Sequence, residues 1–113
     1  MELINTTDDK YLRYQVETGS NTVQMKDCVG KQIMIQHILQ NMTTNQDGED
    51  KVATTLIDTD GLGYQTLSPT VADCCEVLYR IFREKIESGE MMVEIEEKKS
   101  KGGNRFLSLK AIQ

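Results

Sequence analysis

The stretch KVATTLIDTDGLGYQTLSP, residues 51–69, decides the fold. Residues 51–58 alternate between two sets of side chains and are rich in β-branched residues, which predicts a strand. Asp60-Gly61 predicts a tight hairpin turn, so residues 62–67 form the next strand. Ser68-Pro69 predicts the start of a helix, because serine caps a helix well and proline suits its first position.

A long strand and a loop are predicted immediately upstream. Residues 31–42 place Ile33, Ile35 and Leu39 on one face, and residues 43–50 form a polar loop.

Downstream, the helix and two more strands complete the pattern. Apolar side chains recur at helical spacing until Ser88-Gly89, at Val71, Cys75, Leu78 and Phe82. Residues 91–96 and 106–111 then alternate as two strands around the turn at 102–104.

The first 28 residues are predicted to extend a single domain that covers residues 1–113. Residues 1–10 are polar and are expected to be unpaired. Residues 11–17 alternate as a short extra strand, and residues 18–21 have the composition of a turn.

The predicted order after this extra strand is strand, strand, strand, helix, strand, strand. A five-stranded barrel with one α-helix between strands 3 and 4 is the order of the oligonucleotide-binding (OB) fold. Such barrels bind oligonucleotides on the face of strands 2 and 3 and with the loops after strands 1 and 4. The sequence therefore predicts a mainly β protein, an OB-type barrel with an N-terminal extra strand.

The composition fits one small globular domain. The chain has 113 residues, of which 38% are hydrophobic and 27% charged. It contains neither an apolar run of about 18 residues nor a secretory signal, so we expect a cytoplasmic protein that does not enter a membrane. Three cysteines without a C-x-x-C spacing favour reduced thiols over a disulfide framework or a zinc site.

Charge is divided unevenly along the chain. The formal net charge is −5, but residues 98–113 carry +5 and the remaining residues carry −10. Local potential decides where a polyanion binds, and net charge mainly affects solubility. An acidic body with one basic edge can therefore bind DNA at that edge.

No catalytic or metal-binding motif is complete. Gly30-Lys31 lacks the earlier glycine and the following hydroxyl residue that a phosphate-binding loop requires. His37 is the only histidine, and no motif around it supports a catalytic triad, so a structural role is the simpler interpretation. We expect no enzymatic activity, no cofactor and no metal ion.

Candidate DNA contacts gather in the basic loop between the last two strands. Cations there can neutralise phosphates, and the adjacent glycines let backbone amides approach a nucleic-acid strand closely. The four cations are Lys98, Lys99, Lys101 and Arg105. A solvated β-turn is the alternative interpretation.

Aromatic residues supply candidate stacking positions. Tyr64 lies on the hairpin expected to form the strand 2–3 platform, where a tyrosine can stack on any base and contribute about 1–3 kcal/mol. Alternation puts Phe106 on the same face as Lys110, and Tyr14 with Arg13 forms a further aromatic-basic pair. A half-buried structural position is the alternative for both Tyr64 and Phe106.

Two blocks of the sequence resemble one protein family. TTLIDTDGLGYQTLSPTVA, residues 54–72, is similar to its T-T-L, D-G-x-x-Y and S-x-T-V-A run. KSKGGNRFLSL, residues 99–109, is similar to its K-S-x-K-G-N-x-F-x-S-L block, with one residue fewer before the lysine and one extra glycine. A weaker similarity covers residues 14–19. The family comprises the single-stranded-DNA-binding proteins of small tailed bacteriophages that replicate linear DNA by protein priming in Gram-positive hosts.

This resemblance implies an OB-type barrel that coats displaced single strands during phage DNA replication in the host cytoplasm, without a cofactor. It implies stacking at Tyr64 and lysine contacts to the DNA. Some relatives carry an aromatic residue in the loop after the first strand, and residues 43–50 contain none. Replication proteins and further copies of the chain are candidate partners.

The alternative function is an acidic protein-interaction module, or a DNA-mimic inhibitor, that acts on a host protein. The sequence does not distinguish DNA from RNA as the ligand.

Overall fold

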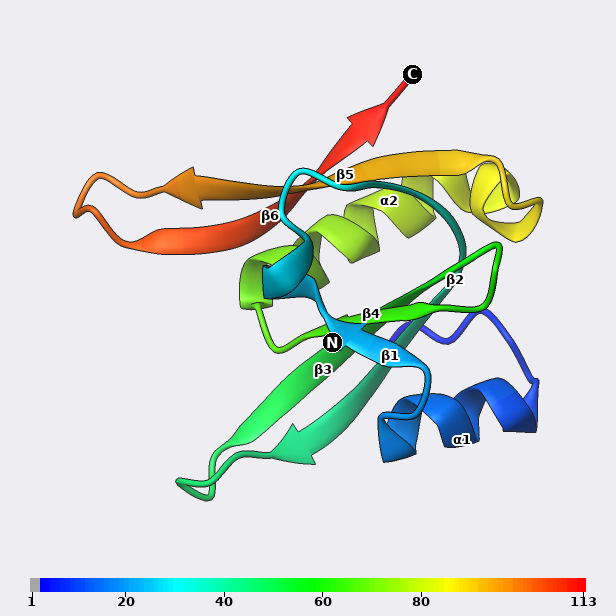
Figure 1. The fold of residues 1–113 in the computed structure, drawn as a ribbon, viewed down its shortest axis with the longest axis horizontal. Coiled ribbons are helices and arrows are strands. Elements are labelled where there is room, and N and C mark those ends of the chain that lie inside the picture. Colours follow the sequence, from blue (N-terminus) through cyan, green and yellow to red (C-terminus); the bar gives the residue numbers. More distant parts are fainter. Residues whose placement is uncertain (1–2) are drawn as a thin grey trace.

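The computed structural model describes residues 3–113, which contain three helices and six strands (Figure 1). In chain order they are α1 (Lys10–Thr18), β1 (Thr22–Gln24), the 3₁₀-helix η1 (Met25–Cys28), β2 (Gln32–Thr44), β3 (Asp50–Asp58), β4 (Gly63–Thr66), α2 (Pro69–Glu87), β5 (Met91–Lys99) and β6 (Arg105–Ile112).

The strands form one curled sheet in the order β1-β4-β3-β2-β5-β6. The β1–β4 pair is parallel and the other neighbouring strands are antiparallel. The long strand β2 pairs with β5 over its first residues and with β3 over the rest, and its register with β3 shifts between Ile35 and His37. Such a bulge bends a strand, and the sheet curls into a half-barrel (Figure 1).

Helix α2 packs inside this curl. It begins where the sequence predicts, because the Ser68 hydroxyl accepts a hydrogen bond from the backbone N–H of Val71 at 3.2 Å. The buried side of α2 and the concave face of the sheet form the main core, which includes Ile35, Ile38, Leu56, Tyr64, Val71, Cys75, Leu78, Ile86, Val93 and Ile95.

The prediction of a mainly β fold is confirmed, but its details differ. Strands β2 to β6 fall where five strands were predicted, yet the sheet described for residues 3–113 has six strands. A second α-helix, α1, precedes the sheet, and α2 lies between the fourth and fifth strands. The architecture is consistent with an OB-like barrel that remains open.

The extra strand predicted at residues 11–17 is wrong, because this segment is helix α1. The Asp9 carboxylate caps it by accepting hydrogen bonds from the backbone N–H groups of Tyr11 and Leu12. Gly19 ends it in a left-handed conformation, φ 74°, which glycine adopts readily. Leu12 and Val16 are four residues apart and pack on the sheet, and this helical spacing was hidden within the apparent alternation.

The expectation that residues 1–10 are unpaired is wrong for residues 4–6. The backbone N–H of Gln40 donates to Ile4 O at 2.7 Å, and Thr6 N–H donates to Ile38 O at 3.2 Å. Asn5 forms a β-bridge with Leu39. This segment therefore continues the sheet beside the part of β2 that β5 does not reach. Residues 1 and 2 lie outside the described part of the chain.

No helix within residues 3–113 is long and apolar enough to cross a membrane.

Candidate nucleic-acid interface

The basic loop forms the tip of the β5–β6 hairpin, which projects from the body of the molecule (Figure 1). Ser100 and Asn104 exchange hydrogen bonds across the turn: Ser100 N–H donates to Asn104 O at 2.8 Å, and Asn104 N–H donates to the Ser100 hydroxyl at 3.2 Å. Gly103 supplies the positive φ of 86° that the turn requires. The K-S-K-G-G-N sequence therefore builds a defined turn that holds its lysines at the tip.

The four cations of this tip differ in their surroundings. Lys98 Nζ lies 3.5 Å from a carboxylate oxygen of Glu96, and Arg105 lies 3.1 Å from Glu97. Both cations are exposed and their carboxylate partners are partly exposed, so the pairs contribute little to stability. Lys99 and Lys101 are exposed and form no ion pair with the residues that the structure describes. These two lysines are therefore the most available to phosphates.

Phe106 is half-buried and lies directly across the hairpin from Lys98. Cross-strand partners share a face of the sheet, so both side chains lie on the same face of the hairpin. The predicted alternation does not continue beyond Phe106, because Ser108 is buried as well as Leu109. Lys110 is exposed and pairs with Glu94 in the β5–β6 register.

The prediction that Tyr64 presents its ring on an open platform is wrong, because only 1% of the residue is exposed. The register places Tyr64 on the α2 side of β4, opposite Leu56. Its hydroxyl donates a hydrogen bond to the Asp58 carboxylate at 3.1 Å, and the Lys31 ammonium lies 5.0 Å from the ring centre. Burial raises the pKa of the Tyr64 hydroxyl. The tyrosine of the D-G-x-x-Y motif therefore stabilises the β3–β4 hairpin from its buried side.

Helix α1 carries the most exposed aromatic side chains. Tyr14 is 70% exposed and Tyr11, three residues earlier on the same helical face, is 88% exposed. Arg13 pairs with Glu17 at 3.3 Å on the neighbouring face. Tyr14 and Arg13 are therefore both accessible to a ligand, on a helix and not on the strand predicted for this segment, and Tyr11 lies beside them.

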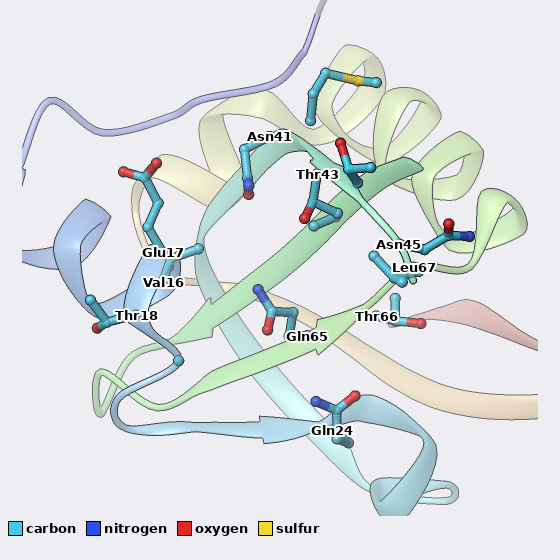
Figure 2. Close-up of a pocket in the computed structure, with 14 residues that line it drawn as sticks. Val16, Glu17, Thr18, Gln24, Asn41, Thr43, Asn45, Gln65, Thr66 and Leu67 are labelled. Carbon is cyan, nitrogen blue, oxygen red and sulfur yellow. The ribbon is translucent and has the colours of Figure 1, made fainter. Parts of the chain in front are cut away.

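A groove of about 580 Å³ opens on the face of the sheet turned away from α2 (Figure 2). Leu12 and Val16 of α1 cover one part of this face by packing on Leu39 and Ile57. The groove occupies the adjacent part, between α1 and the β2–β3 hairpin (Figures 1 and 2). Its lining is mainly polar and uncharged, and includes Gln24, Asn41, Thr43, Asn45 and Gln65.

The groove and the basic hairpin are connected through Ser68. Leu67 lines one end of the groove, and the hydroxyl of the next residue, Ser68, donates to Leu107 O in β6 at 3.5 Å. Leu107 follows Phe106 and Arg105 directly. The end of the groove at Leu67 therefore lies beside β6, the second strand of the basic hairpin.

The β2–β3 hairpin projects to the same side of the molecule and has the opposite charge (Figure 1). Its tip carries Asp47, Glu49 and Asp50, and its one lysine, Lys51, lies 3.4 Å from Glu49. This acidic tip does not favour phosphate contacts.

No motif in the sequence marks the groove. Three of its amides come from β1, β2 and β4, and only the register shows that Gln24 lies beside Gln65 on one face. Simple alternation also misplaces this part of β2, because it groups Leu39, and with it Asn41, with Ile33 and Ile35. The register shift between Ile35 and His37 instead puts Leu39 and Asn41 on the opposite face. The groove is bounded by residues of α1 and β1, and the positions of these two elements were not predicted.

No group of three or more His, Cys, Asp or Glu side chains that could hold a metal ion occurs in residues 3–113. His37 is half-buried, with its Nδ1 3.3 Å from the Thr6 hydroxyl, and burial lowers its pKa. This histidine fits the structural role predicted for it.

A partly open, curled β-sheet with a cationic edge is typical of small domains that bind single-stranded nucleic acid. A family model described as "Phage Single-stranded DNA-binding protein" matches residues 4–112, and the chain belongs to this family. The comparisons found no curated protein and no solved structure that matches the chain. Family membership confirms the resemblance seen in the sequence and favours DNA binding over an acidic protein-interaction module.

Proposed function

We propose that the protein coats single strands displaced during phage DNA replication, as a sequence-independent binder with an OB-like fold and no enzymatic activity. The family match supports single-stranded DNA as the ligand. The basic β5–β6 hairpin is the observation that supports the proposed binding location. The polyanionic strand contacts this edge of an otherwise acidic chain.

The proposed contacts divide into two kinds. Phosphates bind the hairpin cations, Lys99 and Lys101 first, and Lys98 and Arg105 by exchanging their carboxylate partners for phosphate. Bases contact Phe106 beside the hairpin and Tyr14, next to Arg13, on α1. Tyr64 is left out of this set because its ring is buried.

The test is a fluorescence-anisotropy titration of labelled oligo-dT and of a duplex of equal length, at several salt concentrations. We expect tight binding to the single strand, a weaker duplex complex, and a steep loss of affinity with salt. The double variant Lys99→Gln/Lys101→Gln should weaken binding roughly tenfold and reduce the slope of log K against log salt by about 0.7 for each lost phosphate contact.

The matched control is Lys85→Gln, which removes one charge from the exposed end of α2, away from the hairpin. It should leave affinity almost unchanged. Failure of the wild-type protein to bind oligo-dT at low salt would refute the proposed function. Equal losses in the control and hairpin variants would refute the proposed location.

A further inference from the structure

The groove on the open face of the sheet is lined mainly by uncharged polar side chains. Four amide side chains line it: Gln24 of β1, Asn41 of β2, Gln65 of β4 and Asn45 of the β2–β3 loop (Figure 2). The Asn45 oxygen already accepts hydrogen bonds from the backbone N–H groups of Asp47 and Glu49, which leaves the three strand amides as the candidates.

An amide carries two N–H donors and a carbonyl acceptor, as the hydrogen-bonding edges of nucleobases carry donors and acceptors. Gln65 Nε2 donates one hydrogen bond to the Thr55 hydroxyl at 3.3 Å, so its oxygen and its second N–H remain for a ligand. The one charged residue in the lining, Glu17, is paired with Arg13.

The lining contains no aromatic side chain among the described residues. Stacking, the usual way in which single-strand binders hold bases, is therefore unavailable inside the groove. The absence of a cation in the lining also makes the groove a poor site for phosphates. Hydrogen bonding is the interaction that these side chains offer to a base.

Asn41 adds a second observation. Its Oδ1 is shielded from solvent and has no hydrogen-bond partner within the described residues. An unsatisfied buried acceptor destabilises a protein by about 1–3 kcal/mol. A small rotation of this amide, with a ligand N–H in the groove, would satisfy the acceptor, which makes the groove more favourable for a hydrogen-bonding ligand than for an apolar one.

We propose that the groove is a base-edge site: nucleobases of the bound strand enter it and form hydrogen bonds with the amides of Asn41, Gln65 and Gln24. This inference rests on the proposed DNA binding and extends it. Phosphates remain at the β5–β6 hairpin, and the connection from Leu67 through Ser68 to Leu107 lets one strand occupy both surfaces. Affinity then depends on the hydrogen-bonding groups of the bases as well as on phosphate charge.

The test compares oligo-dT with an oligonucleotide of equal length in which difluorotoluene replaces thymine. Difluorotoluene keeps the shape of thymine and its aromatic face but does not form comparable hydrogen bonds. The wild-type protein should bind oligo-dT at least about fivefold more tightly, the equivalent of one net hydrogen bond. The Asn41→Leu variant should bind the two ligands with nearly equal affinity.

Asn41→Leu is a suitable variant because it removes an unsatisfied acceptor and keeps the side-chain size, so the fold should be retained. The matched control is Gln46→Leu, which makes a similar change on the exposed β2–β3 loop outside the groove lining. This control should discriminate between the ligands as the wild type does.

Three outcomes separate the proposals. Wild-type binding to oligo-dT with no discrimination against difluorotoluene would overturn the base-edge site and leave the proposed function intact. Discrimination that persists in Asn41→Leu and in Gln65→Leu would also overturn it. Loss of binding to both ligands by the wild type would instead refute the proposed function.

Discussion

The two faces of the β2–β3–β4 sheet differ in what their residues do. On the face that α2 covers, Leu56 and Tyr64 are buried in the main core, and Thr54 is buried beside them. On the opposite face, Asn41 and Gln65 line an open groove. Leu56 and Tyr64 on the covered face belong to the motifs of the first block that resembles the phage family, whereas Gln65 and Leu67, which line the groove, fall between those motifs. The most visible sequence pattern therefore identifies residues that stabilise the fold, and the candidate ligand contacts lie elsewhere.

The largest expected effect tests this contrast at Tyr64. Tyr64→Ala should lower the free energy of unfolding by about 3–5 kcal/mol, because it removes a fully buried ring and leaves a cavity. Urea unfolding measures this loss.

Tyr64→Leu keeps an apolar side chain in the core and removes the aromatic ring. Under conditions where this variant is folded, it should bind oligo-dT as tightly as the wild type. A loss of tenfold or more would mean that the ring leaves the core and stacks on DNA, and the contrast between the two faces would no longer hold.

Gln40 and Asn41, neighbouring residues on opposite faces of β2, provide a second comparison of the two faces. Gln40 is buried on the covered side, where its Oε1 accepts from Ile4 N–H at 3.1 Å and its Nε2 donates to Ala72 O at 3.4 Å. Gln40→Leu should reduce stability by about 1–3 kcal/mol, because it leaves buried partners unsatisfied. Asn41→Leu should change stability by less than about 0.5 kcal/mol or increase it. Equal destabilisation by the two substitutions, measured by urea unfolding, would show that both amides are structural.

A substitution at Tyr14 tests whether an exposed aromatic side chain stacks on bases, the role that the buried Tyr64 cannot fill. Tyr14→Ala should weaken binding to oligo-dT by about 1 kcal/mol, roughly fivefold, at the lower end of the range for a stacked base. Stability should hardly change, because Tyr14 is 70% exposed. Tyr79→Ala on α2 is the comparison variant, since this tyrosine is half-buried and distant in sequence from the proposed contacts. A Tyr14→Ala protein with wild-type affinity would remove α1 from the interface.

The smallest expected effect is a pH dependence at His37, in the closed part of the otherwise open face. Burial lowers the pKa of His37 in the folded protein, so the unfolded chain binds more protons at acidic pH. Stability should therefore fall as pH decreases through and below about 6.5, the ordinary histidine pKa. Urea unfolding at pH 7.5 and 5.5 should show a smaller difference for His37→Gln, and an equal difference would exclude this histidine as the cause.

Much of the fold could be predicted because its signals are local. Alternation, the Asp60-Gly61 turn and the Ser68-Pro69 cap each act within a few residues, and they located β2 to β6 and α2. The region before residue 28 was predicted less well. Its strand β1 has three residues, and α1 gains much of its stability from packing Leu12 and Val16 on a sheet that is formed by later residues.

The candidate site was predicted in part for the same reason. A lysine-rich segment that contains glycines can be recognised from the sequence alone, so the cations of the β5–β6 hairpin could be predicted as candidate contacts. Whether Tyr64 is exposed depends on which side of β4 faces α2, and only the tertiary structure decides that. The groove depends on the parallel pairing of β1 with β4, residues about 40 positions apart in the chain.

The pairing of residues 4–6 with β2 also protects the protein from aggregation. These residues cover backbone groups of Ile38 and Gln40 that β5 does not reach. An uncovered strand edge is a template on which another chain can add a strand. Trimming the chain after Thr6 would expose that edge in the middle of the longest strand, so N-terminal truncation should promote aggregation before it affects DNA contacts.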